Sequence, residues 1–216
     1  CSYIGRAVNW KIFPLQKILA DILKNEVATR LTIITDNKRE LFKKLDFIQY
    51  KREGLELKFL DNMTPSEIDR FLAKNSQLNF GMGTTALHSA ALGIPTVLMD
   101  YANEPFPDNY AYTWLYESEN FSLGKNISWR KFTGKLQMKN IMEVMSEKES
   151  MEIVSRKCFE YVSRYHDLNV VAGQLRKFVV ESDFRLMDAK EFIPYYSAPH
   201  QFIKRLQKNL IKNGAR

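Results

Sequence analysis

Residues 77–100 read QLNFGMGTTALHSAALGIPTVLMD, and the order of residue types in this stretch predicts the fold. An apolar run at Leu78–Phe80 ends in Gly81-Met82-Gly83, and a helical run of small residues follows. Gly93-Ile94-Pro95 ends that run, because proline cannot continue a helix, and Thr96–Met99 is typical of a buried strand. The stretch therefore predicts a strand, a glycine turn, a helix and a second strand.

The glycine turn has the composition of a phosphate-binding loop. Gly81 and Gly83 let backbone N–H groups approach a ligand, and the helix N-terminus adds N–H donors and a partial positive charge. Thr84 and Thr85 add hydroxyl groups. The same residues also suit an ordinary strand-to-helix turn with threonine as the N-cap, and the glycines alone do not separate the two interpretations.

Strands and helices alternate at short spacing through residue 100, which favours βαβ units and a mostly parallel sheet covered on both faces. The predicted strands before the glycine turn are Ser2–Ile4, Leu31–Thr35 and Leu55–Leu60, and the predicted helices are Pro14–Asn25, Asn37–Leu45 and residues 64–74. Thr64-Pro65-Ser66-Glu67 has the residues of a capped helix start. Ligands of such sheets bind at the carboxyl ends of the strands, where the glycine turn is expected.

The pattern changes after residue 100. Residues 101–129 are rich in aromatic residues, Asn and Pro, with a strand predicted near Phe121–Leu123, and residues 133–182 are mostly helical with breaks near Ser146 and His166. Residues 183–198 are irregular, and a basic amphipathic helix is expected at about 201–212. We therefore divide the chain into an α/β domain at residues 1–182 and a tail at residues 183–216.

Composition limits the class of protein. The 216 residues are 45% hydrophobic, so a packed core is expected, and no apolar run approaches the roughly 20 residues that cross a membrane. The net charge of +7 favours anionic partners such as nucleotides, acidic lipids or nucleic acid. Cys1 and Cys158 lack metal-ligand spacing, which predicts no metal site and a reducing cytoplasmic compartment. We also expect no cofactor. The chain begins at Cys1 inside a predicted strand, so we expect a fragment that lacks an upstream domain.

Three stretches resemble a known family. Gly5–Lys11 (GRAVNWK) is similar to the opening motif of the C-terminal, nucleotide-binding half of GT-B-type glycosyltransferases, Asn62–Leu78 to the helix before their glycine loop, and Leu87–Val97 to the helix and strand after it. The matches come in the family's order and cover roughly the first half of the chain. The resemblance implies a Rossmann-like three-layer α/β/α domain with a helical C-terminal extension.

The resemblance also implies roles for single residues. Arg6 and Lys11 correspond to the residues that grip the donor diphosphate, as a guanidinium and an ammonium group can. The glycine loop and its two threonines would hold the same phosphates. Met63 lies where the family shapes its base pocket, although a packing contact at the helix start explains it equally well.

The sequence departs from the family at two positions. Many members carry acidic residues just before the glycine loop and in the helix after it, and here Phe80 and His88 occupy those places by spacing. His88 can hydrogen-bond a ribose in place of the acid, or pack on the sheet from the helix. Asp100, Glu104 and Asn109 are candidates to contact the donor sugar, with ordinary turn chemistry as the alternative for each.

The predicted function is the donor-binding half of a bacterial glycosyltransferase that moves a sugar from a nucleoside diphosphate to an acceptor hydroxyl in polysaccharide or lipopolysaccharide synthesis. The catalytic acid/base is expected on the other domain, so the chain alone should be inactive. A nucleotide-sugar epimerase of the same fold and a non-enzymatic nucleotide- or anion-binding domain stay open as alternatives.

The expected partners follow from the same resemblance and from the tail. They are a nucleotide sugar and an acceptor glycan, free or lipid-linked, and no nucleic acid, because the basic and aromatic motifs of RNA-binding modules are missing from the sequence. The basic helix near residues 201–212 suits docking on the missing domain, contact with the inner face of a membrane, or formation of a homodimer.

Overall fold

The computed structural model describes residues 1–26, 29–119, 122–127 and 134–182. The chain divides into two compact units, Cys1–Val170 and Val171–Arg216, whereas the sequence analysis put the boundary at residue 182. The predicted irregular segment at 183–198 and the predicted basic helix at 201–212 lie outside the described residues.

A six-stranded sheet in the order β3-β2-β1-β4-β5-β6 forms the first unit. Strands β1 to β5 run parallel, and β6 pairs antiparallel with β5. The strands are β1 (Ser2–Ile4), β2 (Thr29–Thr35), β3 (Leu55–Asp61), β4 (Asn79–Gly81), β5 (Thr96–Leu98) and β6 (Thr113–Trp114). The predicted α/β, Rossmann-like fold with a mostly parallel sheet is confirmed.

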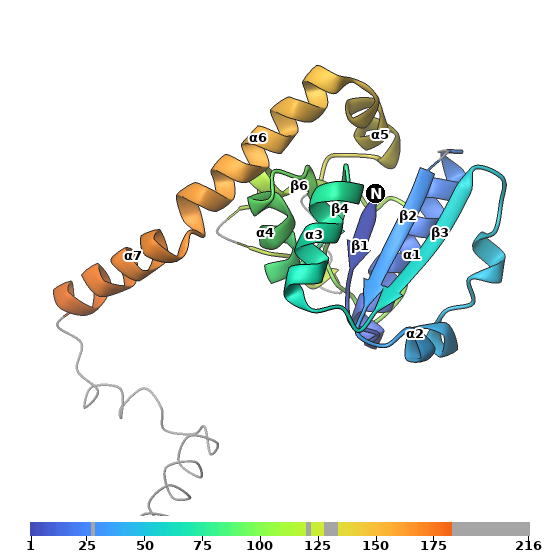
Figure 1. Ribbon diagram of the computed structural model, residues 1–216, viewed down its shortest axis with the longest axis horizontal. Helices are drawn as coiled ribbons and strands as arrows, with labels where there is room; N and C mark the ends of the chain where they lie inside the picture. The colour runs from blue at the N-terminus through green and yellow to red at the C-terminus, as the bar shows by residue number, and fades with distance from the viewer. Residues whose placement is uncertain (27–28, 120–121, 128–133, 183–216) are drawn as a thin grey trace, which may run out of the picture. The chain divides into compact units, whose positions relative to one another are not determined.

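Helices lie on both faces of the sheet, α1 behind it and α3 in front of it in Figure 1. The helices of the described residues are α1 (Asn9–Lys24), α2 (Lys38–Lys44), α3 (Pro65–Asn75), α4 (Thr84–Ala91), α5 (Met138–Ser146), α6 (Lys148–Tyr165) and α7 (Leu168–Glu181), with short 3₁₀ turns η1 (Ile48–Tyr50) and η2 (Leu115–Glu117). The expected breaks near Ser146 and His166 separate α5, α6 and α7.

Each face of the sheet has its own apolar cluster, because neighbouring strand residues point to opposite faces. Tyr3 and Ile33 pack toward α1, whose Leu15, Ile18, Leu19 and Ile22 are 0–1% exposed and recur at helical spacing. Ile4 and Ile34 pack on the other side with Leu72 of α3. Each fully buried aliphatic side chain contributes about 1.5–3 kcal/mol to the stability of the fold. This packing holds α1 and α3 on the sheet, and the loops that connect them to the strands are positioned with them.

Helix α1 begins at Asn9, five positions before the start predicted at Pro14. The prediction was wrong because it placed the proline in the first turn, where its missing N–H costs nothing. Pro14 instead lies inside the helix and is buried. Burial of the apolar face, which begins with Ile12, outweighs the cost of the proline.

The strand predicted near Phe121–Leu123 is not found at Ser122 and Leu123, and Phe121 lies outside the described residues. The antiparallel strand after residue 100 is β6, at Thr113–Trp114. The prediction was wrong because β6 is short and its Trp114 is 3% exposed, so burial on β5, rather than an alternating pattern, selects it.

A buried polar network ties the segment after residue 100 to α1. The Lys17 ammonium and the Asp21 carboxylate lie 2.8 Å apart with side chains 9% and 11% exposed. The Tyr112 hydroxyl donates to the same carboxylate at 2.7 Å, and Lys17 also donates to the Asp108 carbonyl at 3.2 Å. The network therefore joins two segments that lie far apart in the sequence, α1 and the loop at residues 108–112.

Candidate functional site

A cleft of about 430 Å³ lies at the carboxyl ends of β1 and β2. The chain lays β2 and β3 on one side of β1 and β4 and β5 on the other, so the strand order reverses at β1, where ligands of such sheets bind. Loops after three strands and the first turn of α4 meet around the cleft. Its lining residues are Ile4, Gly5, Arg6, Lys11, Ile34, Thr35, Asp36, Met63, Ile68, Thr84 and Thr85.

The loop after β1 is held tightly on both sides. The Gly5 N–H donates to the Ile34 carbonyl at 3.0 Å, and the Ala7 N–H donates to the Asp36 carboxylate at 2.8 Å. A Cβ at Gly5 would come within 2.8 Å of the Tyr3 ring, so a side chain there would displace the tyrosine. The buried Tyr3 hydroxyl donates to the Lys11 carbonyl at 2.7 Å and so fixes the first turn of α1.

Two cations project from this loop and helix. Arg6 is exposed, and Lys11 is partly buried with its ammonium 5.1 Å from the Trp10 ring centroid. Burial, followed by the positive charge of Arg6, lowers the pKa of Lys11, while Asp36 acts in the opposite direction. Because a neighbouring anion favours the ammonium form, an anion bound in the cleft would relieve this unfavourable environment.

The N-cap residue of α1, Val8, makes no side-chain capping hydrogen bond, and the N-cap residue of α4 has no side chain. The N-cap of α4 is Gly83, with φ +61° and ψ −140°, a conformation that residues with a Cβ rarely adopt. Its N–H donates to the Leu123 carbonyl at 2.7 Å, and the Thr85 hydroxyl donates to the Met82 carbonyl at 2.9 Å. The turn is therefore fixed internally, and the first residues of α4, Thr84 and Thr85, line the cleft.

A chain of hydrogen bonds between buried side chains supports this turn from behind. The Ser2 hydroxyl donates to the Asn79 amide oxygen at 2.8 Å, and the Asn79 amide nitrogen donates to the Ser89 hydroxyl at 2.6 Å. Ser89 in turn donates to the Thr85 carbonyl at 2.6 Å. A Cβ at Gly81 would lie 2.8 Å from the Asn79 amide nitrogen, so this glycine makes room for the chain.

The structure brings together five of the residues singled out from the sequence. Arg6, Lys11, Met63, Thr84 and Thr85 all line the cleft, although they come from three separate stretches of the sequence. Gly81 and Gly83 build the turn beside it. Their proposed contacts with phosphate stay predictions.

Other predicted residues lie elsewhere. His88 is not among the lining residues of the cleft, and its Nε2 lies 2.8 Å from the Asp69 carboxylate of α3. Asp100 accepts the Lys125 N–H at 2.7 Å and the Tyr110 hydroxyl at 3.3 Å, so it organises its own loop. Burial raises the pKa of Asp100, and these hydrogen bonds oppose that effect.

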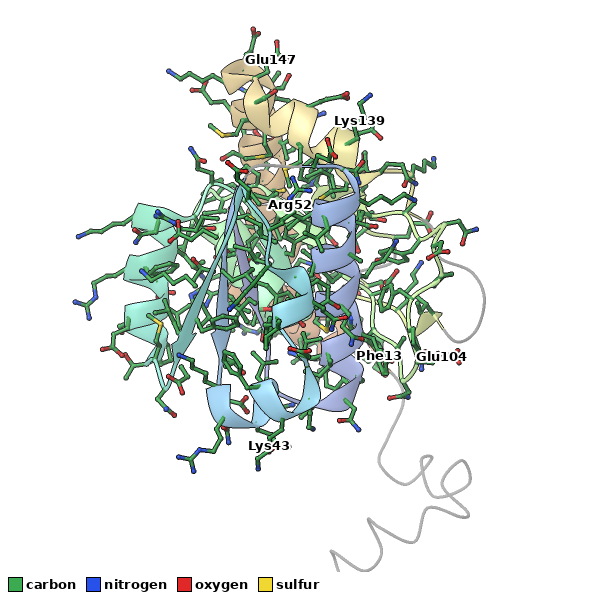
Figure 2. All side chains as sticks on the ribbon, turned by 90° about the vertical axis from the view of Figure 1, so that its right-hand side faces the viewer. Phe13, Lys43, Arg52, Glu104, Lys139 and Glu147 are labelled. Atoms are coloured by element: carbon green, nitrogen blue, oxygen red, sulfur yellow. The ribbon has the colours of Figure 1, made fainter. Side chains whose placement is uncertain are left out.

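Two more predicted residues are on the surface. Glu104 and Asn109 are exposed in the segment after β5, and Figure 2 shows Glu104 at the edge of the protein. Phe80 is fully buried and contacts Tyr112 edge-on, which explains the apolar residue before the glycine loop. The sugar contacts proposed for Asp100, Glu104 and Asn109, and the ribose contact proposed for His88, stay predictions.

Asp36 is the main residue of the cleft that the sequence analysis missed. It follows β2 directly, and its Oδ1 also accepts the Thr35 hydroxyl at 3.3 Å. Ile4, Ile34 and Ile68 were missed too, and they give the cleft an apolar wall. The available signal for Asp36 was an acidic residue at the end of the apolar run LTIIT, because carboxyl ends of parallel strands share one edge.

Among the described residues, no group of three or more His, Cys, Asp and Glu side chains is placed to hold a metal ion. Within the same residues, no helix combines the length and the apolar character needed to cross a membrane.

No protein-family model and no curated protein matches the chain. Solved structures that are similar include TarM, with 13% identity and a TM-score of 0.49, over 82% of this chain and 34% of TarM. A proposed UDP-N-acetylglucosamine 2-epimerase from Listeria monocytogenes has 13% identity and a TM-score of 0.42, over 84% of this chain and 46% of that protein. The chain thus spans less than half the length of either.

Proposed function

We propose that the cleft binds the diphosphate of a nucleoside-diphosphate sugar and that the chain is the donor-binding half of a glycosyltransferase. The observation that supports this most is the convergence of Arg6, Lys11 and the first turn of α4 on one cleft at the strand-order reversal. With Asp36, the charged lining residues carry a net charge of about +1, which suits a polyanion that also carries hydroxyl groups.

Each lining group has a role in this proposal. Arg6 holds phosphate oxygens with its planar guanidinium, and Lys11 adds a mobile charge. The N–H groups at the start of α4 and the Thr84 hydroxyl hold the second phosphate, while the Thr85 hydroxyl fixes the turn. When the sugar leaves, the nucleoside diphosphate gains negative charge, so the same groups stabilise the transition state.

The remaining lining residues suit the nucleoside. Met63 and Ile68 form an apolar wall beside Ile4 and Ile34, against which a base can pack. The Asp36 carboxylate can accept hydrogen bonds from ribose hydroxyls, a role that the sequence analysis gave to His88.

Transfer also needs an acceptor and a general base. We propose that both belong to another domain, that the acceptor is a free or lipid-linked glycan, and that the 216-residue chain alone does not transfer sugar. We also propose that the chain acts in bacterial surface-polysaccharide synthesis and that its basic tail contacts the inner face of the membrane. Measurable sugar transfer by the isolated chain would contradict the assignment of the acceptor site and the general base to another domain.

A thermal-shift panel with UDP, GDP, ADP, CDP, dTDP and their common sugars tests the binding step. A ligand at about a hundred times its Kd adds about 2.7 kcal/mol, which raises Tm by about 5–10 °C in a chain of this size. We expect one nucleoside diphosphate to give this shift and Arg6→Ala or Lys11→Ala to remove it. Lys139→Ala, on the exposed side of α5 in Figure 2, is the matched control and should keep the shift.

Inorganic pyrophosphate separates this function from general anion binding. A shift with pyrophosphate that equals every nucleotide shift would favour a non-enzymatic anion site. No shift with any nucleotide would overturn the proposal. Incubation of a binding UDP-sugar with the chain and detection of the epimeric sugar would favour the epimerase alternative instead.

A further inference from the structure

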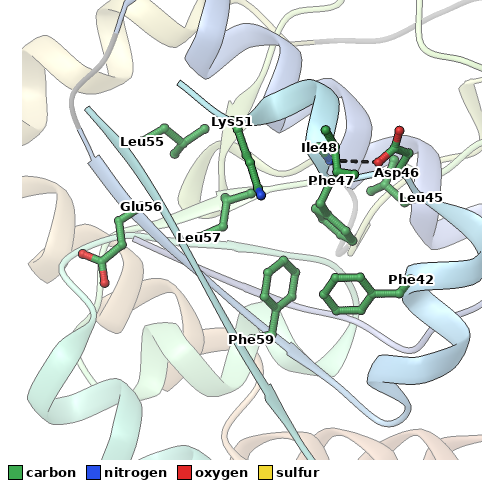
Figure 3. A pocket seen from close by; sticks show the side chains of 10 residues that line it. All are labelled: Phe42, Leu45, Asp46, Phe47, Ile48, Lys51, Leu55, Glu56, Leu57 and Phe59. Carbon is green, nitrogen blue, oxygen red and sulfur yellow. Dashed lines mark hydrogen bonds between the residues drawn. The ribbon is translucent and has the colours of Figure 1, made fainter. Parts of the chain in front are cut away.

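An apolar groove of about 780 Å³ lies beside β3, away from the cleft. Figure 3 shows the rings of Phe42, Phe47 and Phe59 clustered together among its lining residues. The ring centroids of these phenylalanines lie 4.7–5.1 Å apart, yet Phe42 is 43% exposed and Ile48 is 71% exposed. The groove therefore leaves large apolar side chains in contact with water.

The groove exists because α2 is too short to cover β3. Seven helical residues span about 10 Å, whereas seven strand residues span about 23 Å. The face of β3 that carries Leu55, Leu57 and Phe59 is thus only partly covered by α2 and η1. An uncovered apolar face next to a sheet edge is a surface where a further strand can add.

In the described part of the chain, β3 is the last strand on its side of the sheet. The Thr29 N–H donates to the Gly54 carbonyl, so Gly54 points toward β2, whereas the Leu55 N–H donates back to Arg52. Because backbone direction alternates along a strand, the N–H and C=O groups of Leu57 and Phe59 point outward from the sheet. These groups are oriented to bond another strand.

The sequence of β3 is self-complementary in one antiparallel register. If Leu57 pairs with Leu57 of a second copy, Glu56 lies opposite Lys58 and Leu55 lies opposite Phe59. The apolar residues then extend one face across both copies, and the charged residues pair on the other face. A register centred on Lys58 would instead place two ammonium groups opposite each other.

The charged side chains are available for this pairing. Glu56 is 59% exposed and accepts from Arg30 at 2.6 Å, and Figure 3 shows it pointing away from the phenylalanines. Lys58 is exposed, with its ammonium 5.6 Å from the Phe71 ring on the α3 face. In the Leu57-centred register, Lys58 of one copy reaches the Arg30–Glu56 pair of the other.

We propose that the edge of β3 is an interface with a second copy of this chain, in antiparallel pairing centred on Leu57. The two sheets join into one across a two-fold axis, with roughly four backbone hydrogen bonds between the copies. The two apolar grooves meet side by side, so Phe42 and Ile48 lose their exposure to water. The charge pair Glu56–Lys58 occurs twice, once on each side of the axis.

Charge reversal tests this register. Analytical ultracentrifugation of the full 216-residue chain should show a dimer. Glu56→Lys and Lys58→Glu should each raise the dimer Kd by about tenfold or more, because both symmetric pairs become repulsive. An equimolar mixture of Glu56→Lys and Lys58→Glu should form a heterodimer, since all four facing positions are then oppositely charged.

The control is Lys139→Glu, which makes the same charge change as Lys58→Glu but on α5, and it should leave the dimer Kd unchanged. The proposal is overturned if the wild-type chain stays monomeric at 100 µM. This holds also if that monomer binds anionic lipid vesicles in a co-sedimentation assay. It is also overturned if a dimer forms that neither reversal weakens, or if mixing the reversed variants restores nothing. Nucleotide binding in the cleft is measured separately, so either proposal can fail alone.

Discussion

Replacing Asp21 by Asn is the most direct test of how the segment after residue 100 is held on α1. Asparagine has nearly the same shape, and its single amide oxygen can still accept the Tyr112 hydroxyl, so the substitution removes the negative charge and replaces the oxygen that faces Lys17 by an NH₂ group. Lys17, 9% exposed, then keeps an ammonium group without its carboxylate. Breaking a buried ion pair in this way costs about 3–5 kcal/mol. Because each kcal/mol lowers Tm by 2–4 °C in a chain of this size, Tm should fall by roughly 6–20 °C.

Urea denaturation measures the free energy of unfolding directly. The double variant Lys17→Met/Asp21→Asn removes both charges, so it should regain more than half of the loss seen in Asp21→Asn. The matched control is Glu143→Gln, whose partner Lys139 lies 3.9 Å away in an exposed pair on α5. This control should change stability by less than about 0.5 kcal/mol.

Two results would refute the reasoning. A cost below about 1 kcal/mol for Asp21→Asn would mean that water reaches Lys17 despite its low exposure. A double variant as unstable as Asp21→Asn would mean that the loss comes from packing and has no electrostatic origin.

Three further predictions concern single residues. Gly83→Ala should lower the free energy of unfolding by about 1–3 kcal/mol through backbone strain alone, because no atom lies within 4 Å of the added Cβ. Gly173→Ala in α7 is the control and should not lower stability in the same melting experiment. Lys11→Met should raise the Tm of the ligand-free chain. Between the lowered pKa of Lys11 and 10.5, the folded chain binds fewer protons than the unfolded chain, so the wild-type free energy of unfolding should increase as pH rises through that window. If urea titrations give Lys11→Met the same dependence of this free energy on pH as the wild type, the prediction is contradicted. Burial raises the pKa of Cys158 to about 11, so a thiol reagent at pH 8 should label Cys1 in the folded chain and should label Cys158 only after denaturation. Labelling of Cys158 in the folded Cys1→Ser variant would contradict this prediction.

Local patterns in the sequence predicted most of the sheet and the helices around it. The capping box at Thr64 and Glu67 marks the start of α3, and the hydrogen bonds of that box are present in the structure. The β-branched run at residues 31–35 marks β2. Such signals depend on neighbours within a few residues, so they survive without knowledge of the fold.

The parts that were missed depend on contacts between distant segments. Asp36 belongs to the cleft because β2 lies beside β1, and no local pattern gives the strand order. His88 faces Asp69 because α4 lies near α3, and the sequence alone does not place two helices side by side. The first turn of α1 forms where the Tyr3 hydroxyl bonds the Lys11 carbonyl, a contact between residues of a strand and a helix. Propensity yields to such tertiary contacts.

The buried hydrogen bonds among the side chains of Ser2, Asn79 and Ser89 limit which substitutions this protein can accept during evolution. All three side chains are 0% exposed, and the Asn79 amide uses Ser2 and Ser89 as the partners of its oxygen and its nitrogen. Replacement of either serine by an apolar residue would leave one polar atom of the buried Asn79 amide without its partner, at a cost of about 1–3 kcal/mol. Joint replacement by apolar residues of matching volume avoids that cost. Among descendants of this sequence, we therefore expect the three positions to be inherited together, and to vary as a set when they vary at all.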